Sequence, residues 1–329
     1  MPIPYKYESE INMPLYPRQI TEYLAMVGIP RGPNSKIYLV DPANGDNDYN
    51  GSSFLKPVAD LITAEGLCVA GQHDTVLYVA GPTALHMATA LNWDKDYTHL
   101  VGFCAQTMAA QRSRIMYETL LADASPLLNI TSTGCIFRDF YAFHGIDSAT
   151  NLLNVQLNGG GRNLFENVHF AGGGHATQAV TGGASLLLTG DTEENLFKHC
   201  TFGVDTIAAG DGMAAMRLDS TSHRNVFEDC LFTLYAGHAG AIFVKVVDAT
   251  GIDRYTIFKR CMFLNTAAQE MTEAFSIPAM GAPRRIYLKD CDLHGAADWD
   301  ANDRGVLFQN NGTITVGGNA GLMLNTVAA

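Results

Sequence analysis

The sequence predicts an all-β protein whose chain winds into a right-handed parallel β-helix, a solenoid of about 30 residues per coil. Two observations predict this fold. A short segment of the form apolar, charged, polar, apolar, any, apolar recurs at a nearly constant interval, and a second short apolar run precedes its copies. Composition agrees, because 32 glycines and only 16% charged residues in a chain of 329 favour many turns between short buried strands.

The recurring segment aligns five times between residues 163 and 293. Its central apolar position is occupied by Phe165, Phe197, Phe227, Phe258 and Leu288. An earlier copy places Phe137 one interval before the first of these. A period this regular predicts a solenoid in which each coil packs only on its neighbours.

Strict alternation breaks at one position inside each copy. Because a β-strand alternates with period two, the residue between the two strands of a copy must form a bend. The bend position is held by Asn167, His199, Asp229, Arg260 and Asp290. Asparagine, aspartate and histidine enter the left-handed backbone conformation more readily than other residues, and arginine fits this position less well.

Stacked coils place equivalent side chains in ladders about 4.8 Å apart. The phenylalanines would form an internal stack. A second ladder, interpreted as buried packing rather than a redox or metal site because free cysteine is usually buried, consists of Cys200, Cys230, Cys261 and Cys291. An outward ladder that alternates in sign until its last step, typical of a solvated structural face, consists of Glu166, Lys198, Glu228, Lys259 and Lys289.

Residues 37–53 run from a short apolar strand through Val-Asp-Pro into a turn rich in Gly, Asn and Asp, and a proline and a short predicted helix follow. Residues 74–81 then form the first regular strand. This order resembles the first coils of pectate-lyase-like β-helix proteins, including many phage virion proteins. With the repeats, the resemblance covers about residues 37–312, and it implies a fold more than a function.

The predicted helix begins near Pro57 and would cap the open end of the solenoid, which otherwise exposes unpaired strand edges. We therefore expect an N-terminal cap at residues 37–72. The apolar face of this helix is predicted to comprise Val58, Leu61, Ile62, Leu67 and Cys68.

The turn Asp46-x-Asp48-x-Asn50-Gly51 imitates the first half of a calcium loop. Its twelfth position is Pro57 rather than the glutamate that such loops require. Hydrogen-bonded turn chemistry explains the same residues, so both interpretations stay open. Elsewhere the ten histidines recur at no ligand spacing, with His169 at an outward strand position, and the seven cysteines form no CxxC pair. No metal site and no cofactor are therefore expected.

Two terminal segments lie outside the repeat, an N-terminal arm at residues 1–36 and a C-terminal tail at residues 313–329. Both are too apolar for a solvated tail, and residues 20–26 are predicted to form a helix. We expect the two segments to pack on the β-helix itself, on a sister subunit or on another protein. The contact residues predicted for a partner are Pro4, Tyr5, Tyr7, Ile11, Leu15, Tyr16, Leu322 and Leu324.

Charge and patterning argue against several classes of partner. A net charge of −12 disfavours nucleic acid and an anionic membrane surface as ligands. No stretch approaches 18 uninterrupted apolar residues, and the first residues do not have the pattern of a signal peptide, so we expect synthesis in a reducing compartment.

The β-helix proteins that this chain resembles often act on acidic polysaccharides and then carry recognisable catalytic motifs. The hydrolase motifs Asn-Thr-Asp, Asp-Asp, Gly-His-Gly and Arg-Ile-Lys and the lyase motif Trp-x-Asp-His are absent. Glycoside hydrolysis needs two carboxylates within about 5–9.5 Å of each other. The best candidates are Asp191, Glu193, Glu194, Asp219 and Asp248. Tryptophan occurs only twice, which lowers the chance of a long glycan groove.

Two functions remain. The first is a non-catalytic structural protein of a bacteriophage virion. This would be a capsid decoration or cement protein, expected to be a homotrimer, that is assembled in the host cytoplasm and binds the major capsid protein or other virion proteins on the capsid exterior. The alternative is a polysaccharide lyase or glycoside hydrolase, resembling a tailspike depolymerase, that acts on an acidic glycan.

Overall fold

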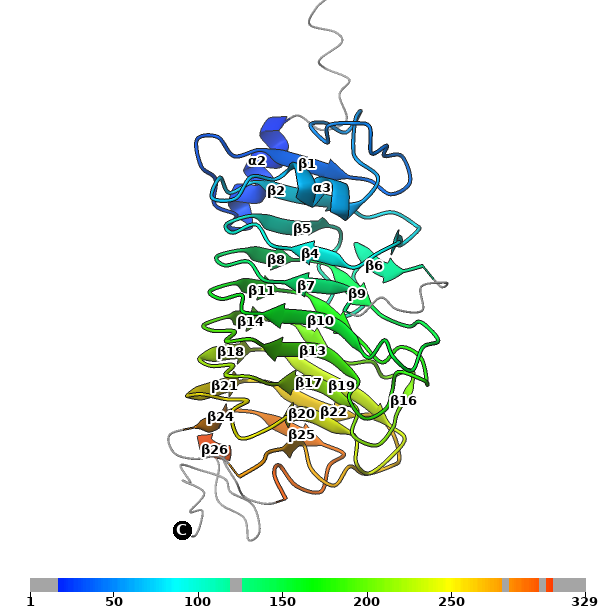
Figure 1. Cartoon of the computed structure of the whole chain (residues 1–329), viewed down its shortest axis with the longest axis vertical. Coiled ribbons are helices and arrows are strands. Elements are labelled where there is room, and N and C mark those ends of the chain that lie inside the picture. The colour runs from blue at the N-terminus through cyan, green and yellow to red at the C-terminus, as the bar shows by residue number, and fades with distance from the viewer. Residues whose placement is uncertain (1–16, 119–125, 280–283, 302–305, 310–329) are drawn as a thin grey trace, which may run out of the picture.

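The computed structural model describes residues 17–118, 126–279, 284–301 and 306–309. The chain forms a parallel β-helix, as predicted, whose coils stack from the N-terminal to the C-terminal end of an elongated body (Figure 1). The described strand pairs between coils are parallel. The strands form three sheets, which we call A, B and C.

Sheet A consists, in spatial order, of β1 (Ile37–Val40), β2 (Thr75–Val79), β5 (His99–Phe103), β8 (Ile136–Arg138), β11 (Leu164–Glu166), β14 (Leu196–Lys198), β18 (Asn225–Glu228), β21 (Tyr255–Lys259), β24 (Arg285–Lys289) and β26 (Val306–Gln309). Sheet B consists of β3 (Leu85–Met87), β6 (Arg114–Tyr117), β9 (Tyr141–Phe143), β12 (His169–Ala171), β15 (Thr201–Phe202), β19 (Leu231–Ala236), β22 (Met262–Asn265) and β25 (Asp292–His294), with β16 (Ala208–Ala209) beside β19. Sheet C consists of β4 (Leu91–Trp93), β7 (Leu128–Ile130), β10 (Leu153–Asn158), β13 (Ala184–Thr189), β17 (Ala214–Leu218), β20 (Ile242–Val246) and β23 (Phe275–Ser276).

The bend between sheets A and B is left-handed in every copy of the repeat. The residues there have φ between 51° and 59°, and they are Asp139, Asn167, His199, Asp229, Arg260 and Asp290. Arg260, the residue that fits worst, donates from Nε and Nη2 to the two carboxylate oxygens of Asp229, both at 2.6 Å. The sequence-predicted bend positions are confirmed.

Two stacks of aromatic rings fill the core. The predicted stack runs through Phe137, Phe165, Phe197, Phe227 and Phe258, with neighbouring centroids 4.5–4.9 Å apart. A second stack, on sheet B, runs through Phe170, Phe202, Phe232 and Phe263. Each of these rings is fully buried, so the stacks provide much of the apolar burial that stabilises the solenoid.

The cysteine ladder is a packing feature, as interpreted from the sequence. Cys200, Cys230 and Cys261 are buried, Cys291 is partly buried, and all four are free thiols. Burial raises the pKa of the Cys230 thiol, so this group is protonated and unreactive at neutral pH.

A ladder of buried asparagines joins the coils at the corner where sheet C leads into sheet A. The backbone N–H of Asn163 donates to Oδ1 of Asn195 at 3.0 Å, and the N–H of Asn195 donates to Oδ1 of Asn225 at 3.1 Å. These bonds satisfy buried backbone donors, which explains why three of the five aligned segments begin with asparagine.

The N-terminal cap contains the predicted helix, α3 (Leu61–Leu67), which begins later than Pro57 suggested. Asp60 is the N-cap, and its Oδ1 accepts a hydrogen bond from the backbone N–H of Thr63 at 2.7 Å. Val58, Leu61 and Cys68 are buried as expected. Ile62 is 40% exposed, so its assignment to the apolar face was wrong: the helix turns Ala64 and Glu65 inward instead.

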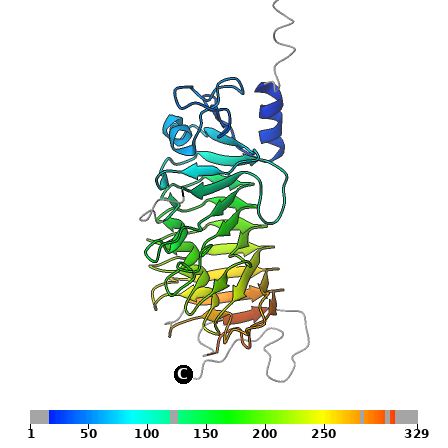
Figure 2. The same cartoon turned by 90° about the vertical axis from the view of Figure 1, so that its right-hand side faces the viewer.

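The helix expected near residues 20–26 is α2 (Pro17–Met26), and it lies along the outside of the solenoid (Figure 2). Ile20 and Leu24 pack against Leu39, Leu77 and Val101 on the outer face of sheet A. In its packing, the described part of the N-terminal arm therefore belongs to the β-helix body rather than to a free arm. Neither α2 nor α3 is long and apolar enough to cross a membrane.

The eight predicted partner-contact residues lie outside the described residues. They are Pro4, Tyr5, Tyr7, Ile11, Leu15, Tyr16, Leu322 and Leu324.

Candidate functional site

The outer face of sheet A carries a regular grid of side chains. One column, which we call the apolar stripe, consists of Ile136, Leu164, Leu196, Val226, Ile257 and Tyr287, aligned by the strand register. Beside it runs the predicted outward ladder, Glu166, Lys198, Glu228, Lys259 and Lys289, in the same register. The stripe was not predicted, although counting outward positions from each buried phenylalanine would have found it.

The charged ladder is partly ion-paired along its length. Lys259 Nζ lies 3.2 Å from Glu228 Oε1, and Arg138, one coil earlier than Glu166, pairs with Glu166 and with Asp139. The partly exposed pair of Lys259 and Glu228 contributes at most about 1 kcal/mol. These contacts fit the interpretation of the ladder as a structural face.

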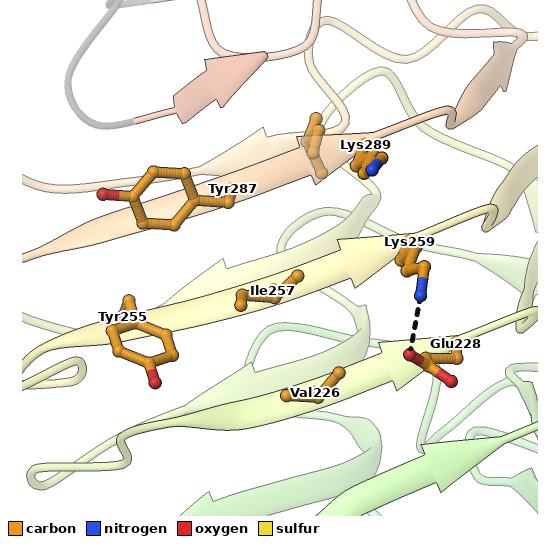
Figure 3. A pocket seen from close by; sticks show the side chains of 8 residues that line it. Val226, Glu228, Tyr255, Ile257, Lys259, Tyr287 and Lys289 are labelled. Carbon is orange, nitrogen blue, oxygen red and sulfur yellow. Dashed lines mark hydrogen bonds and ion pairs between the residues drawn. The ribbon is translucent and has the colours of Figure 1, made fainter. Parts of the chain in front are cut away.

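A groove of about 530 Å³ lies at the C-terminal end of this face, over β18, β21 and β24 (Figure 3). Its walls are Val226, Glu228, Tyr255, Ile257, Lys259, Tyr287, Leu288 and Lys289. Tyr255 and Tyr287 are 36% and 41% exposed, and their ring centroids lie 6.4 Å apart at 77°. The two aromatic rings lie at one end of the groove and the two lysines at the other, where Lys259 pairs with Glu228 (Figure 3). The rings could stack on a sugar ring, and Lys289 could pair with a carboxylate.

The acidic candidates Asp191, Glu193 and Glu194 lie in the turn between β13 and β14, and cations surround them. Glu193 Oε1 lies 2.8 Å from Arg162 Nη2, and Glu193 Oε2 lies 2.9 Å from His223 Nε2. Glu194 is held between Arg162 Nε at 2.9 Å and Arg224 Nη1 at 2.7 Å. We call Arg162, Asp191, Glu193, Glu194, His223 and Arg224 the turn cluster.

The electrostatics of the turn cluster keep Glu193 ionised. Partial burial opposes ionisation of Glu193, but the hydrogen bond from His223 and the charge and hydrogen bond of Arg162 outweigh it, so the pKa of Glu193 is lowered. Asp191 Oδ1 lies 3.5 Å from His223 Nδ1. A carboxylate whose pKa is lowered is a poor general acid, because it holds no proton near neutral pH.

The other two acidic candidates, Asp219 and Asp248, are not in register with each other. Leu218 pairs with Val246, so Asp219 is level with Val247 and Asp248 falls one residue further on. Oδ1 of Asp248 accepts hydrogen bonds from the backbone N–H and the hydroxyl of Thr250, at 2.7 and 2.6 Å. Both bonds lower the pKa of Asp248, and the bond from the hydroxyl has the larger effect. Asp248 therefore stabilises the turn in which it lies.

The calcium-like turn is held by its own hydrogen bonds. Oδ1 of Asp46 accepts from the N–H of Asp48 at 3.0 Å, and Oδ1 of Asn50 accepts from the N–H of Ser52 at 3.1 Å. These are Asx-turn contacts, the second interpretation that the sequence left open. Within the residues that the structure describes, no three or more His, Cys, Asp or Glu side chains gather closely enough to hold a metal ion.

Two histidines are buried as neutral groups. Nδ1 of His169 accepts from the N–H of Ala110 at 3.0 Å, so its Nε2 donates to the carbonyl of Gly203 at 2.8 Å. The sequence placed His169 on an outward position; the segment that contains Ala110 covers it. Nδ1 of His99 accepts from the N–H of Ile136 at 3.1 Å. Burial lowers the pKa of His169 to about 4 and that of His99 to about 3.

Comparison with known proteins gives similarity in structure and none in sequence. No protein-family model matches the chain, and no curated protein matches it. Pectin methylesterase PemA from Erwinia chrysanthemi has a TM-score of 0.57 at 12% identity, over 87% of this chain and 92% of that one. A rhamnogalacturonan lyase has a TM-score of 0.57 at 14% identity, over 83% of this chain and 73% of that one. Pectate lyase Pel9A has a TM-score of 0.50 at 14% identity, over 88% of this chain and 80% of that one.

Identities this low show the fold alone. The chain has the pectate-lyase-like right-handed parallel β-helix fold that is found in pectin-acting lyases and esterases.

Proposed function

We propose that this protein is a non-catalytic structural component of a bacteriophage virion. Its specific role would be that of a homotrimeric capsid decoration protein, which assembles in the host cytoplasm and binds the major capsid protein on the capsid exterior. The observation that supports the non-catalytic part is the turn cluster, in which Glu193 and Glu194 contact the side chains of Arg162, His223 and Arg224.

The turn cluster joins adjacent coils, and the same contacts oppose a role for Glu193 as a general acid. Each of its acids contacts a cationic or ionisable side chain from the preceding or the following coil. A glycosidase needs one carboxyl group that keeps its proton and a second that acts on the opposite face of the sugar. The lowered pKa of Glu193 opposes the first of these roles.

The phage context rests on the resemblance of residues 37–81 to the first coils of phage virion β-helices. The net charge of −12 is compatible with assembly on a protein shell and not with binding to the packaged genome. The terminal segments remain the proposed contacts to the shell.

A second function is favoured by the groove of Tyr255, Lys259, Tyr287 and Lys289. Exposed aromatic rings in the same groove as ammonium groups suit an acidic glycan, and the similar solved structures include a pectate lyase, a pectin methylesterase and a rhamnogalacturonan lyase. In this alternative the chain is a polysaccharide lyase or hydrolase acting on an acidic glycan.

Incubation of the purified full-length protein with polygalacturonate and with methyl-esterified pectin distinguishes the two functions. We expect no unsaturated products, no new reducing ends and no released methanol. Product formation that is lost in Lys289→Ala, and retained in the matched exposed-lysine control Lys56→Ala, would establish the enzyme instead.

The structural role is tested by co-expression with the major capsid protein encoded in the same genome. The full chain should sediment with assembled shells, whereas a chain that lacks residues 1–16 and 310–329 should remain in the supernatant. A full-length chain that stays in the supernatant would contradict the decoration role.

A further inference from the structure

The outer face of sheet A is covered by α2 at its N-terminal end and uncovered further along the solenoid. Over the first coils, its apolar side chains Leu39, Leu77 and Val101 are covered by α2. Ile136 packs at the edge of that cover. Beyond it the apolar stripe continues through four further side chains that are only partly buried and belong to neither apolar cluster of the described residues: Leu164, Leu196, Val226 and Ile257.

Charges flank this uncovered stretch on both sides. On one side is the charged ladder, and on the other is a column that immediately precedes the buried asparagines: Arg162, Glu194 and Arg224. At the β11 level Arg162 faces Glu166 across the stripe. At the β14 level Glu194 faces Lys198, and at the β18 level Arg224 faces Glu228. The two columns therefore carry opposite charges on each of three successive coils.

This pattern is complementary to itself when two copies pack in parallel. A rotation about an axis parallel to the solenoid brings the column of Arg162, Glu194 and Arg224 in one copy against the charged ladder of the next copy. The two columns then meet at the same height along the solenoid. Each level then joins opposite charges: arginine to glutamate, glutamate to lysine, arginine to glutamate. An antiparallel arrangement centred on β14 would place Arg162 against Arg224 and Glu194 against Glu194, which is repulsive. An antiparallel arrangement centred between β14 and β18 would join Glu194 to Arg224 and Lys198 to Glu228, but a two-fold axis relates only two copies. The proposed trimer therefore selects the parallel arrangement.

Most of the charges on this face pair within the chain, and they stay partly exposed to a second copy. The Arg162 side chain is 56% exposed although it pairs with Glu194. None of the ion pairs within the described parts of the chain involves Lys198. The groove end, where Lys259 and Lys289 follow each other, breaks the alternation, so the complementary zone is confined to β11, β14 and β18.

We infer that the outer face of β11, β14 and β18 binds a second copy of this chain, parallel and in the same coil register, around an axis that runs along the solenoid. The inference deepens the proposed homotrimer, and so rests on the proposed structural function, by naming its surface. The apolar stripe lies at the centre of the interface and the two charged columns form its rim.

The first experiment changes the stripe and measures mass by light scattering. Leu196→Gln/Val226→Gln removes apolar surface from outward positions without touching the phenylalanine stack. We expect the wild-type trimer to dissociate to monomers, with an unchanged circular dichroism spectrum. The control Ile62→Gln changes an exposed apolar side chain on α3 and should remain trimeric. A double variant that keeps the wild-type mass would overturn the inference.

The second experiment reports the direction of packing, by mild oxidation of introduced cysteines. Leu196→Cys should cross-link to itself in the parallel arrangement, because equivalent positions meet around the axis. A mixture of Leu164→Cys and Ile257→Cys chains should give no mixed dimer, and a mixed dimer would show antiparallel packing and overturn the inference. The wild-type protein supplies the background of the native thiols.

The outcomes separate this inference from the proposed function. A wild-type monomer without action on polysaccharides would overturn the inference and leave the structural role standing. A trimer that dissociates when the stripe is changed, and that also degrades pectin, would support the inference and overturn the proposed structural function. A monomer in which Leu196→Cys reacts with maleimide only after deletion of residues 310–329 would assign the stripe to the chain's own tail, and this also would overturn the inference.

Discussion

The rings of Phe197 and Phe227 lie parallel, with centroids 4.5 Å apart and planes inclined by 5°. Both rings are fully buried, and the same stacking joins Phe165 to Phe197 and Phe227 to Phe258 in the neighbouring coils. This stack, together with the left-handed bends and the asparagine ladder, fixes each coil on the next. Stability, assembly and binding surfaces can therefore be changed independently, because inward and outward positions alternate along every strand.

Truncation of a stacked ring should be strongly destabilising. Phe227→Ala leaves a cavity between Phe197 and Phe258, and we expect the free energy of unfolding to fall by about 3–5 kcal/mol. Denaturant unfolding followed by circular dichroism measures it. Tyr287→Ala, at an exposed position, should change stability by no more than about 0.5 kcal/mol in the monomer. Equal effects of the two variants would refute the importance of the stack.

The bend at Arg260 should distinguish backbone strain from ion pairing. Its φ of 52° suits glycine and opposes a β-branched residue. Arg260→Val should cost about 1–3 kcal/mol, whereas Arg260→Gly, which loses the same pair with Asp229, should cost less than half of that. Thermal unfolding of the two variants provides the comparison. If glycine were as damaging as valine, the loss of the ion pair rather than backbone strain would account for the destabilisation.

Acid should weaken the fold through its buried histidines. An unfolded histidine titrates near a pKa of about 6.5, but the folded pKa is about 4 for His169 and about 3 for His99. Between about pH 6.5 and about pH 4 the unfolded state binds protons that the folded state excludes. Each histidine therefore lowers stability by up to about 1.4 kcal/mol per pH unit as the pH falls, and contributes no slope above about pH 6.5.

Urea unfolding between about pH 4.5 and about pH 7.5 measures this slope, because that range brackets the pKa of an unfolded histidine. His169→Gln should reduce the wild-type slope in the acidic part of the range and leave the flat region above it unchanged. A wild-type slope in His169→Gln would contradict the assignment of His169 as a neutral buried group.

The two possible N-terminal truncations should behave differently. Deletion of residues 1–36 removes α2 and exposes Leu39, Leu77 and Val101, so we expect a lower unfolding midpoint and aggregation. Deletion of residues 1–16 retains α2 and should leave the midpoint of the monomer unchanged. Differential scanning calorimetry of both chains tests this, and equal midpoints would show that α2 contributes nothing to the body.

Local spacing was sufficient to predict the fold from the sequence. The interval between Phe165, Phe197, Phe227 and Phe258 implied the coil, and the broken alternation implied the bend at positions such as Asn167. Both signals are local in the sequence, and the structure repeats them without change.

The surfaces were harder to predict because they depend on which coil loops reach across one another. The cations around Glu193 and Glu194 come from neighbouring coils, a full repeat away in the sequence, so the sequence showed the acids without their partners. The segment that contains Ala110 buries His169, which is 59 residues further along the chain. Ile62 was misplaced because the buried face of α3 is formed by Leu61, Ala64 and Glu65, at the spacing i, i+3, i+4. Ile62 lies about 100° around the helix from Leu61 and so falls outside this face.

The most direct test of the account is the mass of the purified full-length protein by light scattering over a range of concentrations. An assembling structural protein should have a mass three times the 35.5 kDa of one chain, and should produce nothing from pectin. A monomer at every concentration that cleaves polygalacturonate would contradict the account and establish the groove as the site of an enzyme.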